Sequence, residues 1–232
     1  MQSLSPEIHI FDVCGTLFRD DTTVGFIRWH QQRTGQKAKA LLLWLIFSPE
    51  SPGNFLIKVL ERLTGKHLAK HLAFRTLKGV SIESAAHSAR EYVDFLLERR
   101  KIEPIFHNLR SAQDAEHRVV LASASIHPVI EELASRLNAE YVSSQLETRD
   151  HAFTGCLEQD LSGRKVEQLR KGVNAELFDG ICHGYTDNFS DESLLRLCRH
   201  QTVVLHKPKH RARWSLTEAK YLNLWEIRPS DA

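Results

Sequence analysis

The sequence has no surplus of either charge. Its 31 lysine and arginine residues are nearly matched by 29 aspartate and glutamate residues, which leaves a formal net charge of +2. Such a chain has no overall field that would draw it to nucleic acid or to an anionic membrane. We therefore expect no nucleic acid partner, and only a local basic patch remains possible.

Cysteine is also scarce. The four cysteines include no Cys-x-x-Cys pair and no Cys/His cluster; they are Cys14, Cys156, Cys182 and Cys198. This spacing argues against a disulfide framework and against a structural zinc site. A reducing cytoplasm is the location that suits these residues best.

Long apolar runs are missing as well. The longest, Leu41–Phe47, has seven residues, whereas a helix needs roughly 20 to cross a bilayer. We interpret it as a buried helix rather than one that contacts a membrane. Residues 1–7 have no basic region ahead of an apolar segment, so we expect neither a secretory signal nor stable membrane insertion.

What the sequence does contain is typical of a globular protein with a sizeable core, with 42% hydrophobic and 26% charged residues. Five short β-prone runs are predicted as strands: Ile8–Phe11, Val119–Ala122, Tyr141–Ser143, Ile181–Tyr185 and Thr202–Leu205. Helical spacing follows the second strand at residues 129–137 and the fourth at residues 194–198. Strands that alternate with helices predict a parallel, doubly wound α/β sheet.

Residues 19–116 are far too many for a simple crossover between the first two strands. Apolar residues recur at helical spacing from Ile82 to Leu97, and Ser81 is placed to cap that helix. We therefore predict a core domain of residues 1–18 and 117–232 and an inserted helical subdomain of residues 19–116. Residues 145–148 and 153–156 indicate a β-hairpin, and the basic segment Lys207–Arg213 is interpreted as part of a solvated tail.

Functional groups in a parallel sheet gather beyond the carboxyl ends of the strands. Three of the predicted strands deliver polar residues to that edge, namely Asp12, Ser123 and Asp187. Each alone is a common turn or cap residue. Their joint placement at one edge of the sheet predicts a functional site.

Four motifs appear in an order and at a spacing that resemble a known family. Asp12–Leu17 (DVCGTL) resembles the D-x-D-G-T-L motif of the haloacid dehalogenase superfamily, and Leu121–Ser125 (LASAS) resembles its second motif. Lys165 matches the lysine of the third motif, and Gly184–Asp191 (GYTDNFSD) resembles the acidic fourth motif. The resemblance extends from Ile8 to about residue 205, and the helical insert looks most like the phosphoserine-phosphatase-like branch. It implies a Rossmann-like core with an α-helical cap.

The resemblance implies that Asp12 is the nucleophile and that Mg²⁺ is the cofactor. A phosphate beside two carboxylates needs a divalent cation and fixed positive charge. We expect Asp12, Asp187 and the backbone carbonyl of Cys14 to supply oxygen ligands for the ion. Asp191 is expected to support this site through a metal-bound water or through Asp187.

The phosphoryl group is expected to contact the second and third motifs. Ser123, through its hydroxyl, and Ala124, through its backbone, are predicted substrate-binding residues. Lys165 is predicted to neutralise the transferring phosphoryl group and to orient Asp12. Asn188 is expected to lie just outside the metal ligands.

Cys14 departs from the family pattern. In the related phosphatases, a carboxylic acid at this position protonates the leaving alcohol and then activates water. A thiol has a reference pKa of ~8.5, and anionic neighbours should keep it protonated. Losing a positioned acid/base typically costs roughly 10²- to 10⁴-fold in rate.

Several outcomes follow for an enzyme that carries Cys14. The substrate has a good leaving group, or His67, His71 or His87 of the insert donates the proton. Alternatively, the enzyme is slow or passes the phosphoryl group to an acceptor other than water. Cys14 as a small space-filling residue fits equally well. A second departure is Thr186, where the family usually has glycine.

The predicted function is a cytoplasmic, Mg²⁺-dependent phosphatase of a small phosphorylated metabolite, acting as a monomer or homodimer. One alternative is a metal-independent dehalogenase, since Asp12 and its flanking residues also fit that activity. Asp187 and Asp191 argue against it because a dehalogenase has no use for a metal site. The other alternative is a catalytically impaired module that binds a phosphorylated ligand.

Overall fold

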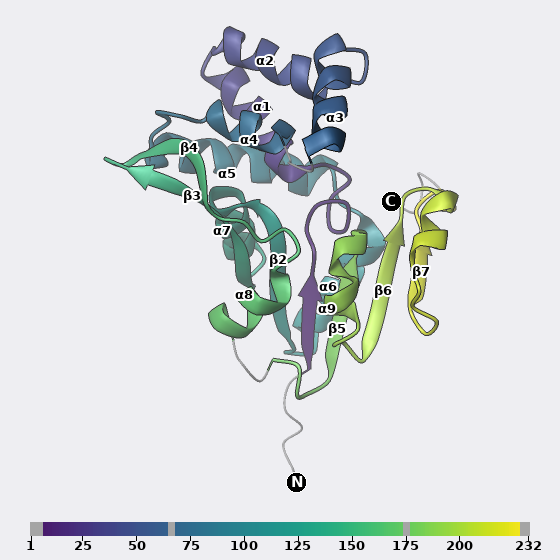
Figure 1. The fold of residues 1–232 in the computed structure, drawn as a ribbon. Coiled ribbons are helices and arrows are strands. Elements are labelled where there is room, and N and C mark those ends of the chain that lie inside the picture. The colour runs from purple at the N-terminus through teal and green to yellow at the C-terminus, as the bar shows by residue number, and fades with distance from the viewer. Residues whose placement is uncertain (1–6, 65–67, 174–176, 228–232) are drawn as a thin grey trace.

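The structure is a computed structural model that describes residues 7–64, 68–173 and 177–227. Its centre is one seven-stranded sheet with the order β4-β3-β2-β1-β5-β6-β7 (Figure 1). The strands are β1 (Ile8–Phe11), β2 (Arg118–Ile126), β3 (Glu140–Arg149), β4 (Ala152–Gln159), β5 (Cys182–Thr186), β6 (His200–Leu205) and β7 (Lys220–Asn223). Neighbouring strands are parallel except for the β3–β4 hairpin.

All five predicted strands are present, and the predicted hairpin is confirmed. The third strand and the first strand of the hairpin are one continuous β3. Asp150 and His151 form the turn with φ values of 49° and 60°, which suits a tight two-residue hairpin.

In the C-terminal half, one prediction is wrong and one helix is shorter than predicted. Lys207–Arg213 is not part of a tail, because it leads through a 3₁₀ turn, η2 (Pro208–Arg213), into β7. The seventh strand is held by Trp214 and Leu216, which pack with β6 in a small core of their own. The helix predicted around residues 194–198 is short, since α9 spans only Glu192–Leu195 after a 3₁₀ turn, η1 (Phe189–Asp191).

Helices cover both faces of the sheet. On one face lie α6 (Glu103–Asp114) and α7 (His127–Arg136), and on the other α8 (Lys165–Gly172) and α9. The alternation of side chains along β1 produces this division, because Phe11 joins the core under α6 and α7 while Ile8 and Ile10 join the core under α8 and α9.

The inserted helices lie above the carboxyl ends of the strands (Figure 1). They are α1 (Thr22–Arg33), α2 (Lys37–Phe47), α3 (Pro52–Thr64), α4 (Leu68–Arg75) and α5 (Ile82–Arg99). The predicted N-cap of α5 is confirmed, because the Ser81 hydroxyl accepts a hydrogen bond from the backbone N–H of Ser84 at 3.1 Å.

The chain leaves and re-enters the core at adjacent points. Phe18 forms a β-bridge with Lys101, and the backbone N–H of Ile102 donates to the Leu17 carbonyl at 2.8 Å. The next helix, α6, packs on β2. We therefore propose that the cap comprises residues 19–100 and that α6 belongs to the core, whereas the sequence suggested a boundary at residue 116.

The prediction that Leu41–Phe47 forms a buried helix is wrong. The run is helical, but only Leu43 and Ile46 are buried, and Leu41, Leu42 and Trp44 are exposed. An apolar run indicates a helix that needs a partner, and the sequence does not say whether this partner lies within the same chain.

Candidate active site

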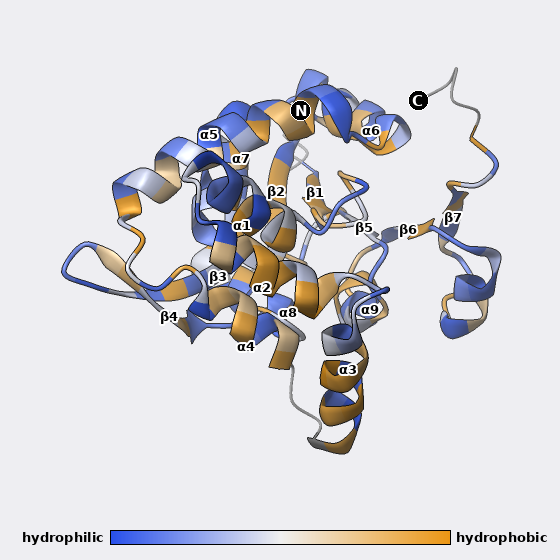
Figure 2. Cartoon of the chain, turned by 90° about the horizontal axis from the view of Figure 1, so that it is seen from above, coloured by the Kyte–Doolittle hydropathy of each residue, from blue (hydrophilic) through white to orange (hydrophobic). Residues whose placement is uncertain are grey.

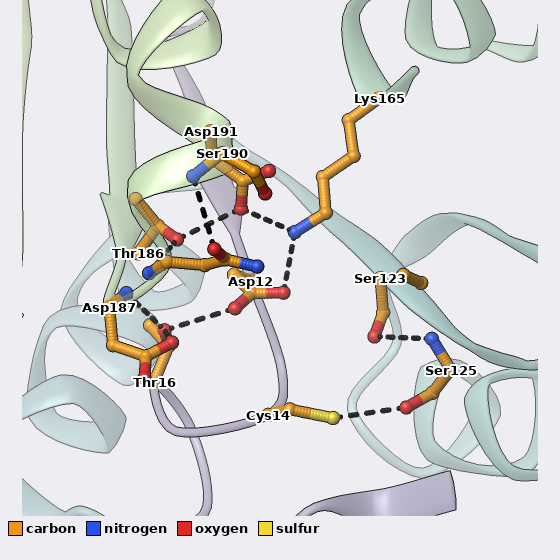
Figure 3. Close-up of polar contacts among 12 residues, drawn as sticks. Asp12, Cys14, Thr16, Ser123, Ser125, Lys165, Thr186, Asp187, Ser190 and Asp191 are labelled. Atoms are coloured by element: carbon orange, nitrogen blue, oxygen red, sulfur yellow. Dashed lines mark hydrogen bonds and ion pairs between the residues drawn. The ribbon is translucent and has the colours of Figure 1, made fainter. Parts of the chain in front are cut away.

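The predicted site residues converge at the centre of the sheet. Asp12 follows β1, Ser123 lies in β2, and Asp187 follows β5, and these three strands are neighbours. Lys165, the first residue of α8, reaches into the same place from one side (Figure 3). The backbone N–H of Asp12 donates to the Tyr185 carbonyl at 2.9 Å, which ties the loop after β1 to β5.

Lys165 lies between two carboxylates. Its Nζ donates to Oδ1 of Asp12 and to Oδ2 of Asp191, each at 2.6 Å (Figure 3). All three side chains are nearly inaccessible to solvent, with exposed fractions of 4%, 6% and 2%. Burial by itself lowers the pKa of Lys165, but the two carboxylates outweigh it and hold this pKa above its ordinary value.

The pKa of Asp12 is raised, first by burial and then by the nearby charges of Asp191 and Asp187, against the opposing effect of Lys165. A buried carboxylate of this kind is stable as an anion only where further positive charge compensates it. The site therefore has more negative charge than its one lysine balances.

The turn after β1 brings Asp187 close to Asp12. The Thr16 hydroxyl lies 3.3 Å from Oδ2 of Asp12 and 3.5 Å from Oδ1 of Asp187, and it accepts a hydrogen bond from the backbone N–H of Asp187 at 2.9 Å. Gly15 has a φ of +72°, and a Cβ at this position would lie 2.2 Å from Oδ2 of Asp187. Only glycine permits this approach.

Thr186, the second departure from the family pattern, positions Asp191. Its hydroxyl donates to Oδ2 of Asp191 at 2.9 Å and accepts from the backbone N–H of Asn188 at 3.0 Å. The Asn188 side chain, at the N-cap of η1, accepts a hydrogen bond from the backbone N–H of Ser190. The Thr186 hydroxyl and the Asn188 side chain thus fix the conformation of the acidic motif.

Ser123 is completely buried and accepts a hydrogen bond from the backbone N–H of Ser125 at 3.2 Å. The sequence predicts a strand that ends at Ala122, just before Ser123, but β2 continues to Ile126, which is the N-cap residue of α7. The reason is an irregularity in the pairing of β2 with β3 between Ser123 and Ile126, which lets the strand continue past Ala124.

Cys14 lies among hydroxyl groups. Its Sγ is 2.9 Å from Oγ1 of Thr22 and 3.0 Å from Oγ of Ser125. Burial, together with the charges of Asp21 and Asp12, raises the pKa of the Cys14 thiol to about 11. At neutral pH this thiol is protonated.

The model of the haloacid dehalogenase-like hydrolase family matches residues 10–196 of the chain. This chain belongs to that family. A search of curated proteins found no match.

Solved structures share the fold at low sequence identity. A Bordetella pertussis Tohama I protein of unknown function has a TM-score of 0.75 and 17% identity, with 94% of this chain and 99% of that chain covered. A HAD family hydrolase from Salmonella enterica serovar Typhi has a TM-score of 0.62 and 16% identity, with coverages of 97% and 69%. A phosphoserine phosphatase, solved as a phospho-aspartyl intermediate analogue, has a TM-score of 0.54 and 17% identity, with both coverages at 94%.

These likenesses confirm the predicted α/β fold with an inserted helical cap, and they confirm at the level of the fold the predicted likeness to phosphoserine phosphatases. The predicted family is confirmed by the family model. The site residues of this hydrolase are assigned below from their geometry.

A cavity of about 320 Å³ opens over Asp12 in this hydrolase. Its core side includes Cys14, Ser123, Ala124, Lys165 and Asn188, and its cap side includes Asp21, Phe47, Glu61 and Lys70. Lys70 links the two sides, because its Nζ donates to Oδ1 of Asp160 at 2.7 Å and to Oγ of Ser162 at 2.8 Å.

Two of the three cap histidines considered as proton donors lie elsewhere. His71 is exposed on α4 and lines a different cavity, and His87 is exposed on α5 near Glu91. His67 lies outside the described residues. Asp21 and Glu61 are the cap carboxylates that face the cavity, and sequence reasoning did not single them out.

His206 is a further residue that sequence reasoning missed. Its Nε2 lies 2.8 Å from the Gly15 carbonyl and 3.4 Å from Oδ2 of Asp187. The hydrogen bond with Asp187 raises the pKa of His206. Because His206 directly follows β6, the rule that strand ends carry functional groups would have identified it.

The residues present fit a divalent cation. Asp12, Asp187 and Asp191 bring three carboxylates together near the ammonium group of Lys165. Carboxylate and carbonyl oxygens are the ligands that Mg²⁺ prefers. Asp187 is the most accessible of the three, with a side chain exposed fraction of 24%. The surplus of negative charge is the feature that such an ion would compensate.

Proposed function

We propose that this hydrolase is a Mg²⁺-dependent phosphatase that acts on a small phosphorylated metabolite through an aspartyl-phosphate on Asp12. One observation carries the proposal. Asp12, Ser123 and Lys165 line one cavity, and the Thr16 hydroxyl lies between Asp12 and Asp187. The carboxylates of Asp12, Asp187 and Asp191 outnumber the ammonium group of Lys165 that they surround.

Asp12 is the nucleophile in this proposal. Its carboxylate oxygen forms a bond to phosphorus while the bond from phosphorus to the ester oxygen breaks, and the leaving oxygen takes up a proton. Water then attacks the aspartyl-phosphate, which releases inorganic phosphate and restores the carboxylate. Lys165 holds Oδ1 of Asp12 in place for the attack and compensates charge on the phosphoryl group.

Ser123 and Ala124 bind the phosphoryl oxygens, the first through its hydroxyl and the second through its backbone N–H. The irregular pairing of β2 at these residues supports this role, since it leaves the local backbone outside a regular ladder.

Asp12, Asp187 and the Cys14 carbonyl would hold Mg²⁺, which supplies positive charge beside the substrate phosphate when it is bound. Asp191 acts through its hydrogen bonds to Lys165 and Thr186, and Asn188 supports the loop that carries Asp187.

Cys14 makes the second half of the reaction slow. A thiol with a pKa of about 11 is a poor base at neutral pH, so it activates water far less well than a carboxylate would. We propose that hydrolysis of the aspartyl-phosphate limits turnover.

The test is release of inorganic phosphate from a panel of phosphorylated metabolites by the purified protein with Mg²⁺. Activity should vanish with EDTA and in Asp12→Asn, whereas Asp150→Asn, a matched change in the exposed β3–β4 turn, should leave it intact. Wild-type activity in Asp12→Asn would refute the proposal. Release of halide from haloacids that persists in EDTA would favour the dehalogenase alternative.

A further inference from the structure

Exposed apolar side chains gather on two helices of the cap. Of the twelve large apolar side chains exposed in the described part of the chain, eight lie in α2 and α3. They are Leu41, Leu42, Trp44, Phe55, Leu56, Val59, Leu60 and Leu63. Phe55 and Leu63 are exposed by 73% and 77%. In Figure 2, much of α2 and α3 has the orange colour of apolar residues. A patch of exposed apolar side chains of this kind marks a binding surface.

The helix α3 has the opposite orientation to that of an ordinary surface helix, because its apolar side chains face outward. Two of its polar residues face the protein: Asn54 is buried and its Nδ2 donates to the Ile46 carbonyl at 2.6 Å, and Glu61 lines the cavity and accepts from the backbone N–H of Ala69 at 2.9 Å. Its apolar residues face outward instead. A surface helix normally buries its apolar stripe against the core, so this orientation requires another occupant.

Charge around the patch has one predominant sign. Between residues 37 and 63, the basic residues are Lys37, Lys39, Lys58 and Arg62, and the acidic residues are Glu50 and Glu61. Because Glu61 faces the cavity, the outer rim of the patch is mainly positive. Helices with Trp, Phe and Leu on one side and Lys or Arg at its border typically lie in the interface of a membrane.

We propose that α2 and α3 bind the surface of an anionic lipid bilayer, with their exposed apolar side chains inserted among the headgroups. The proposal is independent of the chemistry at Asp12.

These helices lie on the bilayer rather than across it. In the described ranges, no single helix combines the length and the apolar composition needed to cross a membrane. The pair Lys37–Phe47 and Pro52–Leu63 meets both requirements only jointly, with a bend of 58°. Leu43, Ile46 and Asn54 are buried in the cap, so the pair is anchored to the protein along one side.

The bilayer would border the mouth of the active-site cavity. Phe47 at the end of α2 and Glu61 of α3 both line that cavity. A protein docked through this surface would therefore face its cavity toward molecules held at the membrane.

The first test is flotation of the full chain with phosphatidylcholine vesicles that contain or lack phosphatidylglycerol. The wild type should float with the anionic vesicles. The triple variant Phe55→Gln, Leu56→Gln, Leu63→Gln should partition less by roughly a hundredfold or more. The double variant Leu197→Gln, Trp225→Gln is the matched control, since it removes exposed apolar residues elsewhere and should float like the wild type.

Charge provides the second test. Lys58→Gln and Arg62→Gln should each weaken binding to anionic vesicles by roughly fivefold, and added salt should weaken binding of the wild type. Because every substituted residue is exposed, the variants should keep the circular dichroism of the wild type.

Wild-type protein that floats with neither vesicle would overturn the proposal. So would a triple variant that floats as well as the wild type. A dimer that the triple variant converts to a monomer, with no vesicle binding by the wild type, would instead assign the patch to a second copy of the chain.

Discussion

At the scale of single residues, Cys14 is the most informative position. Its place two residues after Asp12 and its protonated state follow from the sequence, because thiols beside carboxylates keep their protons. Its contacts with Thr22 and Ser125 could not be foreseen, since these hydroxyls belong to segments that only the folded chain brings together.

Replacing Cys14 with aspartate should raise turnover of simple phosphomonoesters by roughly 10²-fold, because a positioned carboxylate restores general acid/base catalysis. The Thr22 and Ser125 hydroxyls can donate to the new carboxylate and hold it. Cys14→Ser is the control, as a hydroxyl is no better a base, and should give no gain. Measured kcat values that are equal for Cys14→Asp and Cys14→Ser would contradict this account of Cys14.

Gly15→Ala should abolish most activity although it adds only one methyl group. The new Cβ would collide with the Asp187 carboxylate, 2.2 Å away, at a φ of +72°. Mg²⁺ binding measured by calorimetry should weaken along with kcat/KM. Gly163→Ala is the matched control, because Gly163 has a similar φ of +70° with open space around it. Equal effects of the two substitutions would show that backbone strain alone is responsible.

At the scale of elements, the sequence predicts the strands better than it predicts which surface covers each helix. Short apolar runs ended by polar residues identify buried strands such as β1, because both faces of the strand are covered within the chain. The helix α2 shows the limit of this reasoning, since its apolar run predicts burial but not the identity of the covering surface. Strand β7 was missed because its residues are only half-buried at the edge of the sheet.

The sheet also carries a histidine cluster at the end of the strands opposite Asp12. The His9 ring of β1 stacks on that of His183 of β5, with a centroid distance of 4.1 Å. Nε2 of His9 lies 3.1 Å from Nδ1 of His117, and Nε2 of His183 lies 2.7 Å from Oε2 of Glu7. Burial and the charges of the neighbouring histidines, opposed by Glu7, lower the pKa of His9 from 6.5 to about 4.

This cluster predicts acid sensitivity. Between pH 6.5 and about 4, the unfolded chain binds a proton at residue 9 that the folded chain does not, so the free energy of unfolding falls as the pH falls. His9 accounts for up to about 3 kcal/mol of that loss. His9→Gln should flatten the pH dependence, measured by urea denaturation across this range, whereas the exposed His87→Gln should not. If the free energy of unfolding depended on pH in the same way for His9→Gln and the wild type, His9 would not be the source of the acid sensitivity.

At the scale of the whole molecule, the site arises from the order of the strands. The sequence predicts Asp12, Ser123 and Asp187 at one sheet edge because parallel strands present their carboxyl ends together. It does not reveal the cap side of the cavity, because Phe47, Glu61 and Lys70 reach it only through the packing of helices that carry no motif.

The most direct measurement is a crystal structure of the protein with Mg²⁺ and beryllium fluoride, which mimics a phosphoryl group on an aspartate. The account predicts an adduct on a carboxylate oxygen of Asp12, with Ser123 and Lys165 in contact with its fluorines and Mg²⁺ between Asp12 and Asp187. A structure at saturating Mg²⁺ and beryllium fluoride in which Asp12 carries no adduct would contradict it.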